Sequence, residues 1–201
     1  MPKKRLTREE SRELTRRRLV DAAAEVIPQT GYPAATVEEI AETAGYSRGA
    51  FYSNFKTKDE LFLALMRQVA DVKHEMVSAI FDEGGTPEAL FERLRAFYAI
   101  ACRQRGYFLL WSEAKMHATR DAEFRKGLNE LDRETRTHIA GYVARYYEET
   151  GITPPTAPES IALALVALAD GMALIQMLDP EAVPQDIVES VMMQFFDSVT
   201  R

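Results

Sequence analysis

The chain is poor in cysteine and histidine, and this shortage narrows the kinds of protein it can be. Its 201 residues include one cysteine, Cys102, and three histidines. One thiol cannot form a disulfide framework within the chain, nor supply the thiolates of a structural zinc site. A lone thiol suits a reducing compartment, and residues 1–11 contain no apolar stretch typical of a secretory signal. We therefore expect a cytoplasmic protein.

Motifs that mark common catalytic sites are also scarce. The sequence contains no phosphate-binding glycine loop, no His-Glu-x-x-His and no dinucleotide-binding fingerprint. Cys102 has no histidine close to it in the sequence, and His117 and His138 stand too isolated to indicate a metal site. We predict a protein that is not an enzyme and that needs no cofactor and no metal ion. An all-helical enzyme is the alternative from a different class.

The charge is unevenly distributed along the chain. The net charge of −6 argues, as an average, against a nucleic-acid partner. Residues 1–20, however, contain eight basic and only three acidic side chains. A basic end on an acidic body can present a local positive face to a polyanion. A solvated, frayed terminus has the same composition, so charge alone leaves both interpretations open.

Strand-like alternation is absent and helical spacing of apolar residues dominates, which predicts an all-α fold of about nine helices. Glycine and proline mark the breaks, as at Gly31-Tyr32-Pro33 and in residues 84–87. Three threonine or serine residues, Thr36, Ser47 and Thr57, stand at expected N-caps. The expected helices cover about residues 12–29, 37–44, 48–54, 58–80, 87–103, 106–118, 121–150, 159–178 and 184–199.

One expected helix is apolar enough to be weighed as a membrane span. Residues 161–178 contain a single charged side chain, Asp170. A central aspartate costs about 2.5–3.5 kcal/mol on insertion scales, and 18 residues is at the lower limit for a span. The segment is also rich in alanine, which lets helices approach closely. We predict a buried or interface helix and no membrane partner.

Residues 36–55 form the strongest motif. Two short helices separated by Gly45-Tyr46-Ser47 are typical of a helix-turn-helix. Ile40 and Phe51 can lock the helix crossing from inside. The second helix of such a unit enters the DNA major groove by its N-terminal end. The residues expected on the DNA-facing side are Thr36, Tyr46, Ser47, Arg48, Gly49, Tyr52, Asn54 and Lys58.

Residues 36–61, TVEEIAETAGYSRGAFYSNFKTKDEL, resemble the DNA-binding signature of the TetR (tetracycline repressor) family, and the resemblance covers about residues 16–65. It implies that Thr36, Lys58 and Tyr52 contact phosphates. It also implies that Ser47, Arg48 and Gly49 lie at the groove. Asn54 stands where many members have histidine, so a neutral hydrogen bond is expected there. Ala50-Phe51 stands where Thr-Leu is common.

The resemblance implies two domains: a basic arm with a helix-turn-helix DNA-binding domain over residues 1–60, and a helical effector-binding and dimerisation domain over residues 61–201. The last two helices are the interface candidates, since two from each subunit would make a two-fold four-helix interface. Such a homodimer would present two recognition helices to a near-palindromic operator. The expected interface residues are Ala164, Ala167, Gly171, Leu174, Val188, Val191, Met192 and Phe195.

The same resemblance implies a small-molecule effector, expected to be apolar or aromatic. Glu113 could anchor a cationic or hydroxylated ligand, although surface exposure is the alternative, and core packing is the alternative for the aromatic residues. The expected effector-binding residues are Phe97, Phe108, Trp111, Glu113, Met116, Tyr142, Met172 and Ile175. We expect a repressor that its effector releases from DNA through the long helix after Lys58. A ligand-binding or protein-interaction module without DNA binding is the second alternative.

Overall fold

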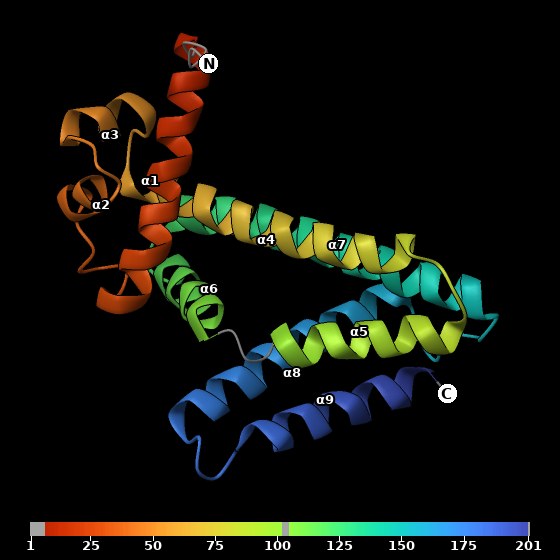
Figure 1. Cartoon of the computed structure of the whole chain (residues 1–201). Coiled ribbons are helices and arrows are strands. Elements are labelled where there is room, and N and C mark those ends of the chain that lie inside the picture. Colours follow the sequence, from red (N-terminus) through yellow and green to blue (C-terminus); the bar gives the residue numbers. More distant parts are fainter. Residues whose placement is uncertain (1–6, 102–104, 201) are drawn as a thin grey trace, which may run out of the picture. The chain divides into compact units, whose positions relative to one another are not determined.

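A computed structural model describes residues 7–101 and 105–200, and within these ranges the chain forms nine helices and no strand (Figure 1). This confirms the predicted all-α class. Cys102 and the basic residues Lys3, Lys4 and Arg5 lie outside the described residues. The helices are α1 (Arg8–Thr30), α2 (Val37–Thr43), α3 (Arg48–Asn54), α4 (Lys58–Asp82), α5 (Pro87–Ala101), α6 (Arg105–Ala118), α7 (Ala122–Thr150), α8 (Pro158–Leu178) and α9 (Gln185–Thr200).

The helices divide into two compact units. Unit 1 contains Met1–Val69 and Leu109–Leu128, and unit 2 contains Ala70–Phe108 and Asn129–Arg201. Helices α4 and α7 contribute residues to both units. This division by packing differs from the expected boundary at residue 60. The first turns of α4, most of α6 and the start of α7 bury apolar residues in the same unit as the N-terminal helices. Unit 1 therefore contains two separate stretches of the chain, which a single boundary in the sequence cannot describe.

Helix α1 begins four residues earlier than the sequence pattern suggests. Thr7 is its N-cap, and the Thr7 hydroxyl accepts from the backbone N–H of Glu10 at 3.1 Å. The Glu10 carboxylate in turn accepts from the backbone N–H of Thr7 at 2.7 Å, which completes a capping box. The apolar residues that predict this helix begin at Leu19, so they do not indicate a start at the polar capping box of Thr7 and Glu10.

The turn between α2 and α3 has the backbone form that its glycine predicts. Gly45 has φ 76°, in the left-handed region, directly after the Ala44 C-cap. The N–H of Gly45 bonds the Glu42 carbonyl at 2.9 Å, and the N–H of Tyr46 bonds the Ala41 carbonyl at 2.8 Å. These two bonds form a Schellman motif. The Ser47 hydroxyl then caps α3 by accepting from the Ala50 N–H at 3.3 Å.

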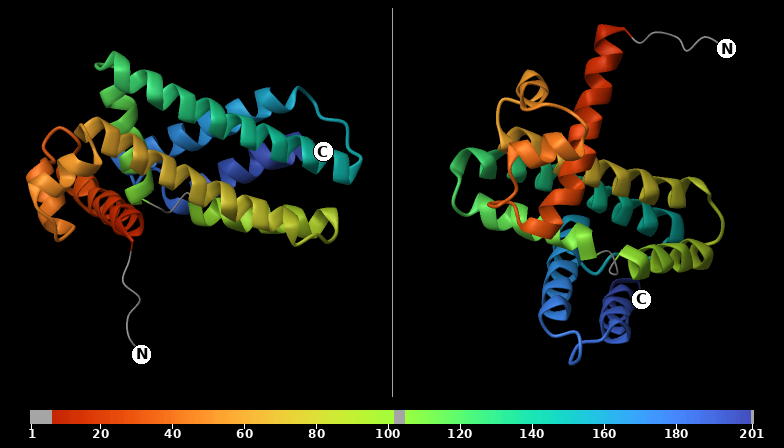
Figure 2. Two further views of the ribbon diagram at one scale, coloured as in Figure 1. Left: turned by 90° about the horizontal axis from the view of Figure 1, so that it is seen from above. Right: turned by 60° about the vertical axis from the view of Figure 1, so that its left-hand side comes forward.

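Helix α1 packs on both α2 and α3, and those two helices pack on each other (Figures 1 and 2). Ile40 and Phe51 are fully buried, as expected of the residues that lock the crossing. The core they join takes Leu19, Ala23 and Ile27 from α1. The recognition helix is therefore held on its inner face by apolar packing, and its outer face remains in contact with solvent.

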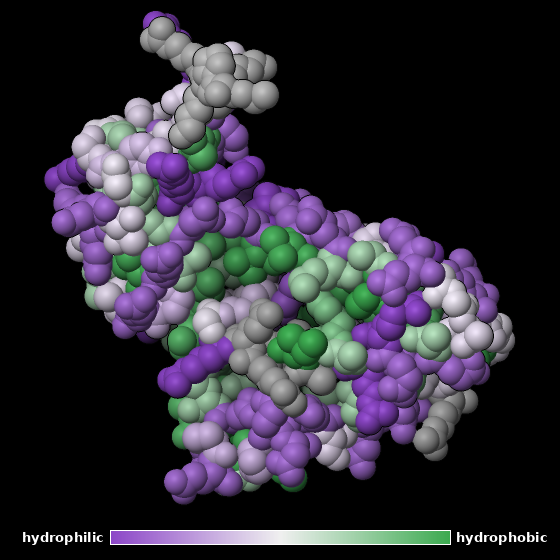
Figure 3. Space-filling model, in the orientation of Figure 1, coloured by the Kyte–Doolittle hydropathy of each residue, from purple (hydrophilic) through white to green (hydrophobic). Residues whose placement is uncertain are grey.

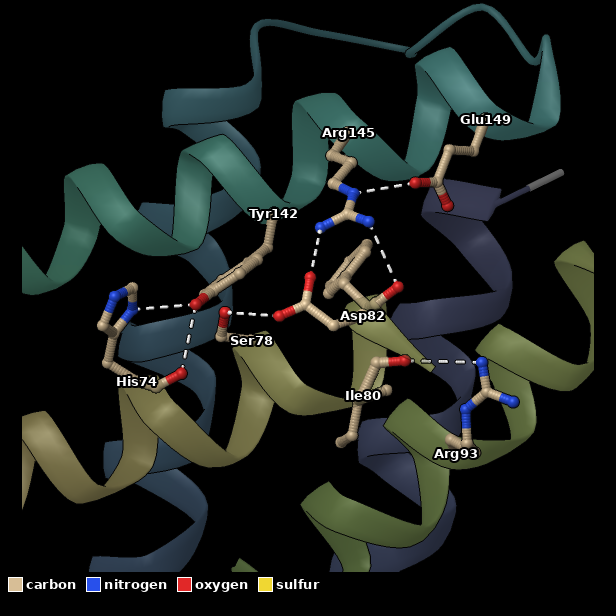
Figure 4. Close-up of polar contacts among 9 residues, drawn as sticks. His74, Ser78, Ile80, Asp82, Arg93, Tyr142, Arg145 and Glu149 are labelled. Atoms are coloured by element: carbon tan, nitrogen blue, oxygen red, sulfur yellow. Dashed lines mark hydrogen bonds and ion pairs between the residues drawn. The ribbon is translucent and has the colours of Figure 1, made fainter. Parts of the chain in front are cut away.

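The described residues of unit 2 include two apolar clusters with polar contacts at their borders. One contains Val77, Phe81 and Leu90, and the other contains Leu165, Val188 and Met192. Beside the first cluster, the Tyr142 hydroxyl lies 2.8 Å from Nδ1 of His74, and Arg145 pairs with both Asp82 and Glu149 (Figure 4). These contacts join α4 to α7 inside unit 2. In the second cluster α8 packs against α9.

We expect Gly45→Ala to lower the free energy of unfolding by about 1–2 kcal/mol, because an L side chain is strained in the left-handed region. Gly49→Ala is the matched control: Gly49 is helical and an added Cβ would stand 3.7 Å from the Ser47 hydroxyl. Alanine there should be neutral or stabilising by up to about 1 kcal/mol. Urea unfolding of both variants tests this, and equal effects would contradict the role of Gly45.

Candidate DNA-binding surface

The N-terminal end of α3 is open to solvent. Ser47, Arg48 and Gly49 are all exposed. The Arg48 guanidinium forms an ion pair with Glu38 of α2 at 2.7 Å, and both side chains remain largely exposed. An exposed pair of this kind contributes at most about 1 kcal/mol and exchanges readily for another anion. Arg48 is thus held on the surface at the helix end whose free N–H groups favour negative charge.

Two further predicted residues lie on the outside of this unit. Tyr52, one turn after Arg48, is 48% exposed, and the Arg48 guanidinium lies 5.5 Å from its ring centre. Thr36 is exposed and caps α2 by accepting from the Glu39 N–H at 3.1 Å. Its hydroxyl hydrogen is still available to donate to a phosphate. Tyr46 is half-buried in the turn. Hydrophilic residues predominate on the face of unit 1 that Figure 3 shows.

The structure corrects the expectation for Asn54. This side chain is only 8% exposed, and its amide nitrogen donates to the Ala50 carbonyl at 2.8 Å. The last turn of α3 turns it inward, so in this conformation it cannot reach a phosphate. It instead completes the C-terminal turn of the recognition helix. Its position in the sequence, next to exposed polar residues, gave no sign of this burial.

Lys58 also has a structural use that the sequence did not indicate. Its ammonium donates to the carbonyl oxygens of Tyr32 at 2.7 Å and Ala35 at 2.8 Å, and it lies 4.3 Å from the centre of the Tyr32 ring. Burial lowers the pKa of Lys58, and the nearby Asp59 carboxylate acts in the opposite direction. Two of its three N–H donors therefore hold the α1–α2 turn, and one is left for another acceptor.

Arg16 is a positioning residue that sequence reasoning missed. From α1 its guanidinium donates to the main-chain carbonyl of Asn54 at 2.6 Å and lies 4.0 Å from the centre of the Phe55 ring. It thereby caps the C-terminal end of α3 and fixes the recognition helix on α1. The sequence placed Arg16 among several similar arginines of a basic end, and only the packing distinguishes it from them.

Polar side chains of α4 and α6 form a cluster around Tyr32, in the loop that precedes α2. Glu113 accepts from the backbone N–H of Tyr32 at 3.1 Å, so its carboxylate is engaged inside unit 1. The Tyr32 hydroxyl donates to Asp59, and Nε2 of His117 lies 2.9 Å from the same Asp59 oxygen. Burial, followed by the Asp59 contact, raises the pKa of Tyr32 far above its usual value. His117 is isolated in the sequence but not in the fold.

Comparisons with known proteins agree with this geometry. Residues 19–65 match the model of bacterial regulatory proteins of the tetR family, and residues 92–201 match the C-terminal domain of BetI-type transcriptional repressors. The chain belongs to the TetR family of bacterial regulators. The predicted resemblance is confirmed, and with it the expectation of a helix-turn-helix transcription regulator rather than an enzyme.

Individual relatives of this TetR-family chain match over nearly its whole length. It is 27% identical over 203 residues to the HTH-type transcriptional regulator PksA of Bacillus subtilis (strain 168), covering 93% of this chain and 90% of PksA. A crystal structure of a transcriptional regulator from Rhodococcus sp. Rha1 has TM-score 0.74 and 26% identity, covering 92% and 95% of the two chains. A putative regulator from Saccharomonospora viridis, solved in complex with choline, has TM-score 0.75 and 20% identity, covering 92% and 98%.

Residues 45–49 of this regulator also fit a hydrolase motif, but the fold around them differs from that of a hydrolase. The letters Gly45-Tyr46-Ser47-Arg48-Gly49 also fit Gly-x-Ser-x-Gly, the nucleophile turn of α/β-hydrolases. That turn requires a strand before the serine, whereas here α2 precedes it, and Ser47 serves as the N-cap of α3. The serine of this regulator is a helix cap.

The expected effector residues of the regulator fall in several places. Trp111, Glu113 and Met116 belong to unit 1, where Trp111 is buried and Met116 is exposed. In unit 2, Phe97 and Tyr142 share the cluster around Phe81, and Met172 belongs to the cluster around Met192. Phe108 is half-buried and Ile175 is exposed. Among the eight expected effector-binding residues, Phe97 and Tyr142 pack against the same apolar cluster.

The expected interface residues of the regulator separate into two groups. Val188 and Met192 are each 1% exposed, because they pack against Leu165 of α8. They are core residues of unit 2, which corrects their assignment to a free interface surface. The second group lies at least partly in contact with solvent: Ala164, Ala167, Gly171, Leu174, Val191 and Phe195.

By length and composition alone, α8 could also cross a membrane.

Lys58→Met should lower the free energy of unfolding by about 1–3 kcal/mol, because it removes two hydrogen bonds from a charged donor while keeping the aliphatic chain. Lys56→Met is the control, since Lys56 is exposed and a surface substitution should stay within about 0.5 kcal/mol. Chemical unfolding of both variants gives the comparison. Equal stability of the two would show that the α1–α2 turn does not need Lys58.

Proposed function

We propose that this regulator is a repressor that binds a near-palindromic operator as a homodimer and is released by a small-molecule effector. The observation that carries the proposal is the exposed Ser47-Arg48-Gly49 segment at the N-terminal end of α3, held from behind by buried Phe51. A soluble DNA-binding regulator of this family acts where the chromosome is, so we also propose a cytoplasmic location and no membrane partner.

In the proposed complex α3 enters the major groove by its N-terminal end. Arg48 exchanges its exposed ion pair with Glu38 for a guanine edge, which offers two acceptors to a guanidinium. Gly49, without a side chain, permits close approach of the backbone. Thr36 and Tyr52 donate to phosphates and so fix the register without reading bases. Lys58 contributes mainly by holding the α1–α2 turn, with one N–H left for a phosphate.

The homodimer uses the outer side of α8. Leu174, Ile175 and Leu178 are exposed there, together with the small residues Ala164 and Ala167. An exposed apolar helix face is costly for a soluble monomer and marks an association surface. A second copy of the same helix, related by a two-fold axis, would cover it with a like surface. This accounts for the apolar character of α8 without a membrane.

The effector is proposed to bind in the C-terminal unit, with Phe97 and Tyr142 among the residues it contacts. The choline complex of the Saccharomonospora viridis protein supports a small organic ligand as the class to probe first. Because α4 supplies residues to both units, a shift of this helix can change the spacing of the two recognition helices. A coupling free energy of about 1–3 kcal/mol is enough. An effector that left operator affinity unchanged would contradict this mechanism.

Arg48→Ala should weaken binding to the preferred duplex, chosen by selection from a random library, about tenfold to hundredfold. Binding to random duplex should change little, because the lost contact reads a base. Arg133→Ala, which removes an exposed arginine of α7, should leave both affinities unchanged. Titrations across a salt series provide the measurement. Equal losses on selected and random duplex would assign Arg48 to phosphate contact instead.

Leu174→Glu should convert the dimer to monomer, because a charge replaces an apolar side chain at the proposed interface. Val72→Glu is the control: Val72 of α4 is 51% exposed, close to the 48% of Leu174, but lies outside α8 and α9. Sedimentation equilibrium of both variants at several concentrations measures the state. A Leu174→Glu protein that remains dimeric would place the interface elsewhere.

A further inference from the structure

Three side chains of metal-binding type meet in unit 1, outside the surface proposed for DNA. Asp59 is the second residue of α4, His117 lies in the last turn of α6, and Asp121 precedes α7. One ligand atom from each lies within 4.8 Å of the other two, and all three residues are half-buried. Nε2 of His117 is 2.9 Å from Oδ1 of Asp59. Separate segments of the chain thus converge on one point.

We propose that Asp59, His117 and Asp121 bind a divalent transition-metal ion of the zinc type. One imidazole nitrogen and two carboxylate oxygens suit such an ion, and three protein ligands leave a further position for water. Bonds of about 2.0–2.2 Å to a tetrahedral ion place ligand atoms about 3.3–3.6 Å apart. The three ligand atoms lie within 4.8 Å of one another, so they need to close by up to about 1.5 Å, which rotation of the two carboxylate side chains can supply.

The surroundings orient the proposed ligands. The Tyr32 hydroxyl donates to the Asp59 carboxylate, and Oδ1 of Asp121 accepts from the Phe124 backbone N–H at 2.7 Å. Hydrogen bonds from neighbouring groups to ligating carboxylates are typical of metal sites, because they fix the ligand before the ion arrives. The Tyr32 and Phe124 ring centres lie 4.5 and 4.6 Å from that of His117. These ring contacts limit the rotation of the imidazole.

Two cations of the same region hydrogen-bond to carbonyl oxygens. The Lys58 ammonium bonds the carbonyl oxygens of Tyr32 and Ala35, and one Arg125 nitrogen donates to the Ala118 carbonyl at 3.2 Å. The proposed site itself contains two carboxylates, and a divalent ion would offset their mutual repulsion. In doing so it would tie the start of α4 to the end of α6 and the start of α7.

The test is titration of the metal-free, full-length wild-type protein with Co²⁺, followed by its visible absorption, and with Zn²⁺ by equilibrium dialysis. We expect one ion per chain. Asp121→Asn and His117→Asn should each weaken affinity at least tenfold; asparagine at 121 can still accept the Phe124 N–H, so α7 keeps its cap. Tyr32→Phe keeps the ring and removes the donor to Asp59, and should weaken affinity about tenfold.

Two control variants address two other side chains that could bind a metal ion, His138 and Cys102. His138 lies stacked on His74 with ring centres 3.9 Å apart, and Cys102 is the chain's one thiol. His138→Gln and Cys102→Ser should bind Co²⁺ and Zn²⁺ as the wild type does. The proposal is overturned by a wild type that binds neither ion, by unchanged affinity in either ligand variant, or by loss of binding in either control. No DNA is present, so the outcome is independent of operator binding.

Discussion

Tyr32 makes the contacts on which the geometry of unit 1 depends. It is 3% exposed, and each of its polar groups has a partner. Its N–H donates to Glu113, its carbonyl accepts from Lys58, and its hydroxyl donates to Asp59. Its ring stacks on Phe62 with centres 4.4 Å apart. Because Tyr32 lies in the loop between Gly31, the C-cap of α1, and Thr36, the N-cap of α2, these contacts set where the helix-turn-helix begins.

The recognition helix is positioned by different forces on its two sides. On the inner side Phe51 is fully buried and Arg16 holds the C-terminal end. On the outer side Arg48 forms an exposed ion pair with Glu38 and lies over the exposed Tyr52 ring. Packing and a well-made hydrogen bond keep the backbone in place, whereas the exposed pair is weak enough to be replaced by a DNA contact. A short helix of seven residues needs this support, since it is unstable alone.

The polar cluster around Tyr32 lies in unit 1, and the exposed apolar residues of α8 and α9 lie in unit 2. The contacts of Asp59, His117 and Glu113 bring α6 into the same unit as the helix-turn-helix. The exposed apolar residues of α8 and α9, such as Leu174, Leu178 and Ile187, lie in the other unit. Helices α4, α6 and α7 each supply residues to both units.

The sequence by itself determined the helical class, the positions of the short helices and the family. These depend on local signals: the N-caps Thr36 and Ser47, the left-handed Gly45 and the apolar spacing around Ile40 act within a few residues. Only the tertiary structure decided which polar side chains remain on the surface. Asn54 is buried, and Lys58 and Glu113 are engaged within unit 1, because their partners lie on other turns and helices. A sequence pattern does not show which distant residues a side chain will contact. For the same reason, the sequence did not predict that His117 lies close to Asp59 and Asp121.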